Sequence, residues 1–348
     1  MSKYFITLKP VEDYFFGGEN TFKNNDNEET NYFARSNPYP QQTSLLGLLR
    51  HLLLISNNAL PLYKNKDLAV ELIGGKSFNP ENEVEEQNFG LIKDISPLCI
   101  FNKKNKKIYR ISLAHENFTL IENEGQILLN KVKDSTYTIN DYDPKEYYGA
   151  ILYDADNNSL EFDEVFKEIK PKIGIDKDRE QDDENKMFKQ IFYTLKSDFY
   201  FALYANIKDN YSFNNKENKT NINKSGIIAF GGEQKQFAYE LAKEEEPQFI
   251  KEPKFSIKHE NKIVLLSDAY VNKSIFDNAK IILNEIQDFR TVTIGFYKQK
   301  FKKEKVKYNL LKRGTVIFYN AKNEECIIKE LEEYKNYRNI GFNQYIKK

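Results

Sequence analysis

The sequence is poor in the residues that most often build metal sites and catalytic centres. It has no tryptophan, two cysteines, two methionines and three histidines in 348 residues. Cys99 and Cys326 stand in unrelated contexts without a CxxC pair, so neither a disulfide framework nor a structural zinc site is expected. His51, His115 and His259 show no HExxH or HxE spacing, which favours structural or surface roles over metal binding. We expect no metal and no cofactor.

The sequence also lacks the motifs that carry common enzyme chemistry. It contains no GxSxG, no Walker GxxxxGK[ST] and no GxGxxG, which argues against a serine hydrolase, a P-loop NTPase and a dinucleotide-binding protein. The pair Gly17 and Gly18 is not followed by the helix that a phosphate-binding loop needs. Acidic stretches such as "ENEVEE" are typical of solvated surface. We therefore predict that the protein is not an enzyme.

Net charge and long apolar runs are absent too. Lys plus Arg and Asp plus Glu both number 52, so a polyanion would have to bind a local patch. The longest apolar run, residues 45–55, is interrupted by Arg50 and His51 and is too short to cross a bilayer. The first ten residues alternate like a strand and lack the apolar core of a signal peptide. We expect a cytoplasmic protein without membrane contact.

What is present suits a large folded chain. Hydrophobic residues make up 40% and aromatic residues 14%, almost all Tyr and Phe, which provides material for a core despite the many Lys, Glu and Asn side chains. The charged stretch "KEEEPQFIKEPK" is poor in apolar residues and suggests a boundary near residue 250. We predict two domains, 1–250 with insertions and a smaller one at 251–348.

Hydrophobic periodicity predicts an α+β chain with antiparallel sheets. Expected strands cover residues 3–16, two segments within 96–113, 172–176, segments within 187–207, the two arms of 226–239, 261–271, 291–299 and 314–320. Expected helices cover the leucine-rich segment after Pro40, residues 274–287 and residues 323–335. An Asn- and Glu-rich loop is expected at 20–31.

The leucine-rich helix begins within "YPQQTSLLGLLRH", residues 39–51. Thr43 or Ser44 is predicted to be the N-cap, and the helix start with its neutral donors would form an anion site. Thr43, Gly47 and Arg50 form a stripe, and Gly47 costs the helix about 1 kcal/mol relative to Ala, which indicates a close approach there. An RNA phosphate would fit. In the alternative, Gly47 accommodates a neighbouring strand and Arg50 pairs with a buried carboxylate.

Other features allow two interpretations each. Gly231 and Gly232 lie between two predicted strands, where they let a ligand come close to the backbone or simply form a turn. The lysine-rich runs 102–110 and 298–314 carry interleaved aromatic residues and suit either RNA or a solvated hairpin. Arginine is scarce, with seven residues against 45 lysines. Each arginine is therefore a candidate for a position where the planar, two-pronged guanidinium group is required.

Taken in order, several segments resemble the RAMP superfamily of CRISPR–Cas proteins. They are "YFFGGEN", "YPQQTSLLGLLRHLL", "KIGIDKDREQDDENKMFKQIFYTL", "GIIAFGGEQKQFAY" and "RNIGFN", and they span residues 1–345. The nearest likeness is to the type III-B (Cmr) subunits that hold the 5′ handle of the guide RNA. "IGIDKDR" with its charged loop is the most specific segment, whereas "PQQTSLLGLLR" is common to many RAMP proteins.

The resemblance implies two ferredoxin-like (RRM-like) domains with inserted loops, and RNA binding without catalysis in antiviral defence. The implied partners are the crRNA 5′ handle, the large polymerase/cyclase-like subunit and the backbone RAMP subunit, with target RNA contacted only indirectly. Carried over to this chain, the candidate RNA-binding residues are Gly17, Gly18, Arg35, Ser36, Tyr39, Gln41, Gln42, Thr43, Ser44, Arg50, Asp178, Arg179, Gly231, Gly232, Gln234, Lys235, Gly341 and Asn343. The helical stripe adds Gly47, and the scarcity of arginine adds Arg313 and Arg338. Around Gly341 the glycine-rich pattern is incomplete.

Two other functions remain open from the sequence. A RAMP endoribonuclease that processes guide-RNA precursors would need a general acid or base, for which His51 and His115 are the candidates. A subunit that only contacts other proteins would use the helix start as a structural element.

Overall fold

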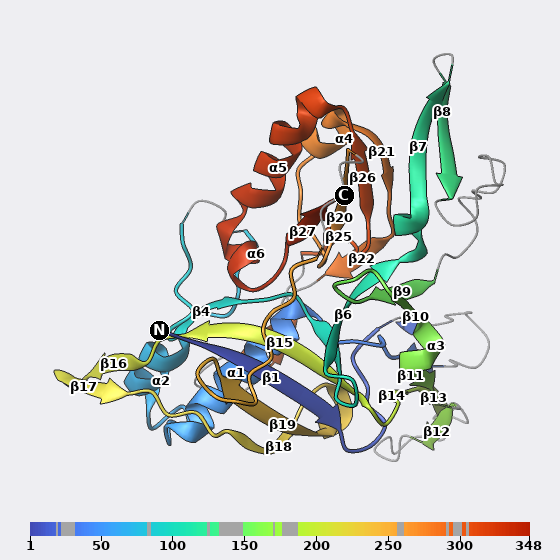
Figure 1. Cartoon of the computed structure of the whole chain (residues 1–348). Coiled ribbons are helices and arrows are strands. Elements are labelled where there is room, and N and C mark those ends of the chain that lie inside the picture. The colour runs from blue at the N-terminus through green and yellow to red at the C-terminus, as the bar shows by residue number, and fades with distance from the viewer. Residues whose placement is uncertain are drawn as a thin grey trace, which may run out of the picture.

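A computed structural model of the chain describes residues 1–18, 20–21, 32–81, 85–123, 126–131, 149–169, 171–175, 187–255, 261–289, 292–294, 301–303 and 306–348. Asp178, Arg179 and most of the predicted 20–31 loop lie outside these residues. Figure 1 shows one large sheet with helices against it and a smaller sheet carrying helices of its own.

The centre of the large sheet is β1 (Ser2–Pro10). It pairs antiparallel with β15 (Phe199–Ile207) on one side and with β19 (Gln236–Lys243) on the other. Its alternation sends Ile6 and Leu8 into the main core and Phe5 to the opposite face. The sheet has the order β10-β9-β6-β5-β15-β1-β19-β18, and β4 also pairs with β15. The remaining bounds are β4 Ile92–Ile95, β5 Cys99–Asn102, β6 Lys107–Leu113, β9 Ala150–Tyr153, β10 Ser159–Glu161 and β18 Ser225–Ala229.

The predicted leucine-rich helix is α1 (Gln42–Ser56), which is followed by α2 (Lys66–Ile73). Leu45, Leu49 and Leu52 of α1 are at most 2% exposed and lie in the same core as β1, as their helical spacing requires. The predicted N-cap is wrong, because Gln41 in extended conformation occupies that position and no side chain caps the helix. The helix begins at Gln42, whose side chain is fully buried and hydrogen-bonded within the protein.

Short strands surround this layer. The four-stranded sheet β12-β13-β3-β2 consists of Lys172–Ile175, Met187–Ile191, Tyr32–Arg35 and Asn20–Thr21, and its β13–β3 pair is parallel. The two-stranded pairs are β7–β8 (Phe118–Asn123, Gln126–Lys131), β11–β14 (Phe166–Glu168, Tyr193–Leu195), β16–β17 (Asn210–Phe213, Lys216–Lys219), β22–β25 (Ile286–Phe289, Tyr308–Leu311) and β23–β24 (Val292–Ile294, Phe301–Lys303). The short helix α3 is Phe162–Val165.

The smaller sheet has the order β21-β26-β20-β27, with β21 Ala279–Leu283, β26 Val316–Tyr319, β20 Lys262–Leu265 and β27 Tyr345–Lys347. Its helices are α4 Ser274–Asn278, α5 Glu324–Glu333 and α6 Lys335–Asn339. The predicted helix over 274–287 is wrong beyond Asn278, because residues 279–283 pair with β26 as a strand. The β-branched Ile281 and Ile282 suit a strand better than a helix.

The predicted α+β class with antiparallel sheets is confirmed. Within the described residues, no strand pair crosses residue 250, yet the largest apolar cluster contains both Leu49 and residues Tyr337 and Phe342. The predicted boundary and the two ferredoxin-like domains therefore stay predictions. No helix in the described part of the chain is long and apolar enough to span a membrane.

Candidate nucleic-acid interface

The glycine turn after β1 lies between two other predicted segments. On one side, the amide of Phe16 donates to Ser36 Oγ at 2.7 Å, and the amide of Asn37 donates to the Phe16 carbonyl at 2.7 Å. The Asn37 side chain also donates to the Gly17 carbonyl at 2.6 Å. On the other side, the amide of Gly232 donates to the Phe15 carbonyl at 2.7 Å. The structure thus brings together residues 15–18, 35–37 and 231–235.

The glycines of this junction have different roles. A Cβ on Gly18 would lie 2.3 Å from the Arg35 carbonyl oxygen, and one on Gly231, whose φ is +86°, would lie 2.7 Å from the Phe15 carbonyl oxygen. A Cβ on Gly232 would lie 3.0 Å from the Phe15 ring. These three allow close approach within the protein. Gly17 is exposed, and its Cβ would meet nothing within 4 Å, so its backbone is open to a ligand.

A pair of lysines packs on one aromatic ring beside the junction. The ammonium groups of Lys172 and Lys235 lie 4.7 and 5.2 Å from the ring centre of Phe192. Lys235 also lies 3.0 Å from a carboxylate oxygen of Glu12 and 3.7 Å from one of Asp13, and Lys172 lies 2.5 Å from Asp13. Lys172, Phe192 and Asp13 were not among the residues predicted from the sequence. Lys172 and Phe192 lie inside the segment 172–195 that was already singled out, and Asp13 directly precedes the segment 14–20.

The formal charges of the junction nearly cancel. Arg35, Lys172 and Lys235 contribute three positive charges, against four negative charges from Glu12, Asp13, Glu168 and Glu233. Arg35 is half exposed and lies 4.0 Å from Glu168, and Glu233 accepts a long hydrogen bond from Gln190 at 3.5 Å. Ser36 is buried and is used inside the protein, whereas Gln234 is exposed. An RNA here would be held through backbone and neutral donors rather than by net charge.

From Ser36 the chain runs directly to the start of α1. Tyr39 is half-buried, and the guanidinium of Arg313 stacks over it, with its central carbon 4.7 Å from the centre of the Tyr39 ring. Arg313 is 1% exposed and donates to the Leu98 carbonyl at 3.4 Å. It therefore binds groups of the protein and offers nothing to solvent. Gln41 and Thr43 are half-buried.

The outward face of α1 is a stripe of Ser44, Gly47, His51 and Ile55, all exposed. A Cβ on Gly47 would meet nothing within 4 Å, so the alternative in which Gly47 accommodates a neighbouring strand is wrong. Nothing in the described part of the chain requires a glycine at this position. Because glycine weakens a helix interior, its presence favours an approach from outside the chain.

Arg50 contacts a loop of the protein. Its guanidinium donates to the Lys76 carbonyl at 3.0 Å and lies 5.7 Å from the ring centre of Phe89. Burial lowers the pKa of Arg50 to about 10, so it remains charged at neutral pH. Among the described residues no carboxylate pairs with Arg50, which instead holds the loop after α2 against the helix.

Gln42 and Gly341 join the two halves of the chain. The fully buried Gln42 amide donates to the Ser96 and Ile340 carbonyls at 3.0 Å and accepts from the Leu98 amide at 3.2 Å. A Cβ on Gly341, whose φ is +85°, would lie 2.0 Å from the Gln42 side-chain nitrogen. Both residues therefore have packing roles that leave them no exposed surface for RNA.

The rest of the second glycine loop is also internal. Asn343 is fully buried, donates to the Tyr270 carbonyl at 2.7 Å and accepts from the Tyr270 amide at 2.9 Å. Arg338 is one-third exposed and lies 3.2 Å from Glu332. Gly341 thus lies at the contact between the halves, whereas Asn343 and Arg338 bind residues of the second half.

The basic runs are largely paired where they are described. Lys107 lies 2.5 Å from Asp154, Lys312 lies 2.5 Å from Glu285, and Lys307 pairs with Asp288. Arg110 is 2% exposed and forms a buried two-point ion pair with Glu116. These contacts favour the hairpin interpretation over a free cationic surface.

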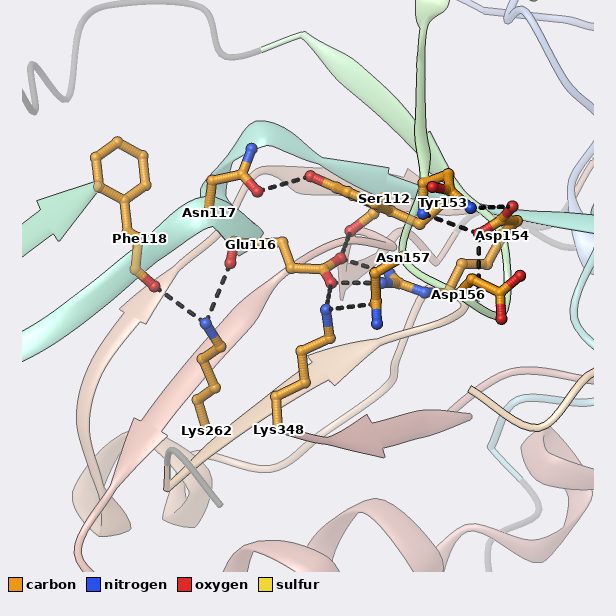
Figure 2. A network of polar contacts seen from close by, with 12 residues as sticks. Ser112, Glu116, Asn117, Phe118, Tyr153, Asp154, Asp156, Asn157, Lys262 and Lys348 are labelled. Atoms are coloured by element: carbon orange, nitrogen blue, oxygen red, sulfur yellow. Dashed lines mark hydrogen bonds and ion pairs between the residues drawn. The ribbon is translucent and has the colours of Figure 1, made fainter. Parts of the chain in front are cut away.

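Glu116 is the centre of a buried network that no sequence motif indicated (Figure 2). Besides Arg110, its carboxylate binds the ammonium of Lys348 and accepts from Ser112 Oγ at 2.6 Å. Lys262 donates to the Glu116 carbonyl at 3.2 Å. Burial alone would raise the pKa of Glu116, but Arg110 and Lys348 outweigh it and hold the pKa at about 2. The network ties β6 to the end of the chain.

Comparison with known proteins identifies relatives along the whole chain. A family model described as "CRISPR-associated protein (Cas_Cmr3)" matches residues 6–347. Among solved structures, a chain of the "Type III-B Cmr-beta bound to cognate target RNA" has a TM-score of 0.50 at 13% identity, covering 99% of this chain and 96% of that one. A chain of the "Csm3-Csm4 subcomplex in the type III-A CRISPR-Cas interference complex" has a TM-score of 0.37 at 12% identity, covering 92% and 93%. No curated protein matches the sequence.

Proposed function

Because the chain belongs to the CRISPR-associated Cmr3 family and is a RAMP-like subunit of a Cmr-type, type III effector, we propose that it holds the 5′ handle of the guide RNA without cleaving it. In this proposal it bridges the large polymerase/cyclase-like subunit and the backbone RAMP subunit, and it meets target RNA only indirectly. The observation that carries the proposal is the convergence of residues 15–18, 35–37 and 231–235 at the segment that leads into α1.

The groups exposed there fit single-stranded RNA. Gly17 and Gly47 have no side chain to keep a phosphate at a distance, while Ser44 and Gln234 are exposed neutral hydrogen-bonding side chains. A junction whose charges nearly cancel grips arbitrary polyanions weakly. It depends instead on hydrogen bonds that a fixed RNA shape can satisfy.

We expect Gly47→Glu to reduce guide-RNA retention in the assembled complex at least tenfold, because the new carboxylate would lie on the outward stripe of α1 and repel a phosphate. The fold should tolerate the change, since a Cβ at this position meets nothing within 4 Å and Glu favours a helix over Gly. Retention is measured as RNA recovered per complex after gel filtration.

Gly75→Glu is the matched control, because Gly75 is also exposed and its Cβ would approach only the Val70 side chain, at 3.7 Å. It should retain guide RNA like the unmodified protein. If Gly47→Glu retains RNA equally well, the handle lies elsewhere, and the interpretation of α1 as a surface for protein contacts alone gains support.

One observation favours a second function, the processing of guide-RNA precursors. His51 lies on the same exposed stripe as Ser44 and Gly47, and partial burial lowers its pKa, so the imidazole is neutral near pH 7 and able to accept a proton. His115 is 4% exposed and less accessible to a phosphate. Purified protein is incubated with labelled repeat RNA in EDTA. Metal-independent cleavage that disappears in His51→Ala would replace the non-catalytic proposal.

A further inference from the structure

The nine-stranded sheet has two edges, and they differ. At one edge β10 has only three residues, and the chain continues directly into α3. At the other edge β18 has five residues, "SGIIA", and pairs with β19 alone among the described strands. Figure 1 shows β18 along the margin of the molecule with no other labelled strand or helix outside it. Among the described residues, one edge of the large sheet is thus open.

Hydrogen bonding fixes which backbone groups of β18 face outward. The amide of Leu241 donates to the Lys224 carbonyl at 2.7 Å, and the amide of Phe230 donates to the Lys235 carbonyl at 2.8 Å. In an antiparallel ladder such pairs recur every second residue, so Gly226 and Ile228 face β19. The N–H and C=O groups of Ser225, Ile227 and Ala229 therefore point away from the sheet.

These outward residues are all exposed, and Ile227 is exposed to 68%. The usual protections of an edge are missing, since residues 225–229 contain no charge, no proline and no recorded register shift. A row of alternating donors and acceptors beside an exposed isoleucine complements an extended polypeptide, whose backbone presents the same groups at the same spacing. RNA is a poorer fit, because the segment has no cation for phosphates.

We propose that β18 binds an extended segment of another protein subunit of the effector complex, which adds a tenth strand to the large sheet, with Ile227 as its apolar anchor. This inference rests on the proposed bridging role of the chain. β18 leads directly into the turn at residues 231–235, so the added strand would lie next to the proposed RNA junction. The same hairpin would then contact a neighbouring protein through its edge and RNA through its turn.

Ile227→Pro tests the hydrogen bonds, because it removes an outward N–H while the inward pairs of Gly226 and Ile228 keep theirs. We expect binding of the neighbouring subunit, measured with the purified full-length protein and the other purified subunits, to weaken at least tenfold. Ile227→Lys keeps every backbone N–H and places a charge at the apolar anchor, so it should weaken the same association. This second variant tests the proposal even if the proline variant folds poorly. The control is Ile286→Lys, since Ile286 is exposed to 65% but lies on β22 in another sheet. It should assemble normally.

Hydrogen exchange resolved to single amides identifies the occupant. On assembly of the whole complex, the amides of Ser225, Ile227 and Ala229 should exchange at least tenfold more slowly. Unchanged exchange would overturn the proposal. Slowing in the protein alone that grows with concentration would overturn it in favour of a second copy of this chain. Slowing with guide RNA alone would overturn it in favour of RNA.

Guide-RNA retention is measured on the same samples, so that the two proposals fail separately. Normal RNA retention with an unprotected β18 rejects the added strand and leaves the handle proposal standing. A protected β18 with RNA retention insensitive to Gly47→Glu rejects the handle proposal and leaves the edge contact.

Discussion

At the scale of single residues, the ionic contact at Glu116 is the deepest in the described part of the chain. Glu116 and Arg110 are 1% and 2% exposed, and the ammonium of Lys348 completes the site from the other half of the chain. Buried ions are tolerated only when each is matched, because removing one partner leaves the others without solvation or countercharge. The site therefore makes stability sensitive to one carboxylate.

Glu116→Gln should destabilise the protein by about 3–5 kcal/mol, because it leaves two buried cations without a countercharge. Urea unfolding followed by circular dichroism measures the loss. The matched control is Asp156→Asn. The Asp156 side chain is 78% exposed, and its ion pair with Lys107 is long, at 3.7 Å. That change should stay within about 0.5 kcal/mol. A Glu116→Gln variant as stable as the control would contradict the assigned role.

The same residue predicts a pH dependence. Its pKa is about 2 in the folded protein and has an ordinary value of 4.5, so its contribution is fully present above about pH 4.5 and is lost as pH falls toward 2. The stability difference between the unmodified protein and Glu116→Gln should therefore shrink across this window. A difference that stays constant from pH 6 to pH 2.5 would show that the Glu116 charge does not stabilise the fold.

At the scale of elements, periodicity predicted strands and helices wherever the local pattern was unambiguous. The pairs β5–β6 and β18–β19 and the helices α1 and α5 follow their predicted segments. Residues 274–287 fit a helical pattern, but residues 279–283 form a strand because they pair with the edge of β26. A tertiary contact of this kind leaves no local signal in the sequence.

The same limit applies to the site. The resemblance to RAMP proteins indicated residues 17–18, 35–44 and 231–235, and the structure brings the first and last of these against residues 35–37. The sequence could not show that Gln42, Arg313 and Asn343 are buried. The same polar residue type is used on the surface and in the interior, where it forms hydrogen bonds with backbone groups. The contact of Arg50 could not be predicted either, because its partner, the Lys76 carbonyl, lies 26 residues further along the chain.

At the scale of the whole molecule, the halves before and after residue 250 have separate sheets but share their largest core. Leu49 of α1 and Phe342 near the chain end are both fully buried in it. Gln42, Arg313 and Lys348 add polar contacts across the same boundary. A cluster that contains residues of both halves couples their unfolding.

We therefore expect one cooperative unfolding transition for the full chain, despite its length. Because the chain has no tryptophan, far-ultraviolet circular dichroism and tyrosine fluorescence provide the two probes, and their urea midpoints should coincide. Two resolved transitions would instead support the predicted boundary near residue 250 as a limit between independently stable domains.

The pairing of β1 also constrains the order of events during synthesis. This strand is translated before both of its partners, since Ser2 pairs with Ile207 and Tyr4 pairs with Lys243. The central strand of the sheet therefore has no lateral partners until residues 199–243 have left the ribosome. Long-range pairing of this kind slows folding and lengthens the exposure of apolar strands. Chaperone demand and aggregation during expression should thus depend on how quickly residues 199–243 follow β1 out of the exit tunnel.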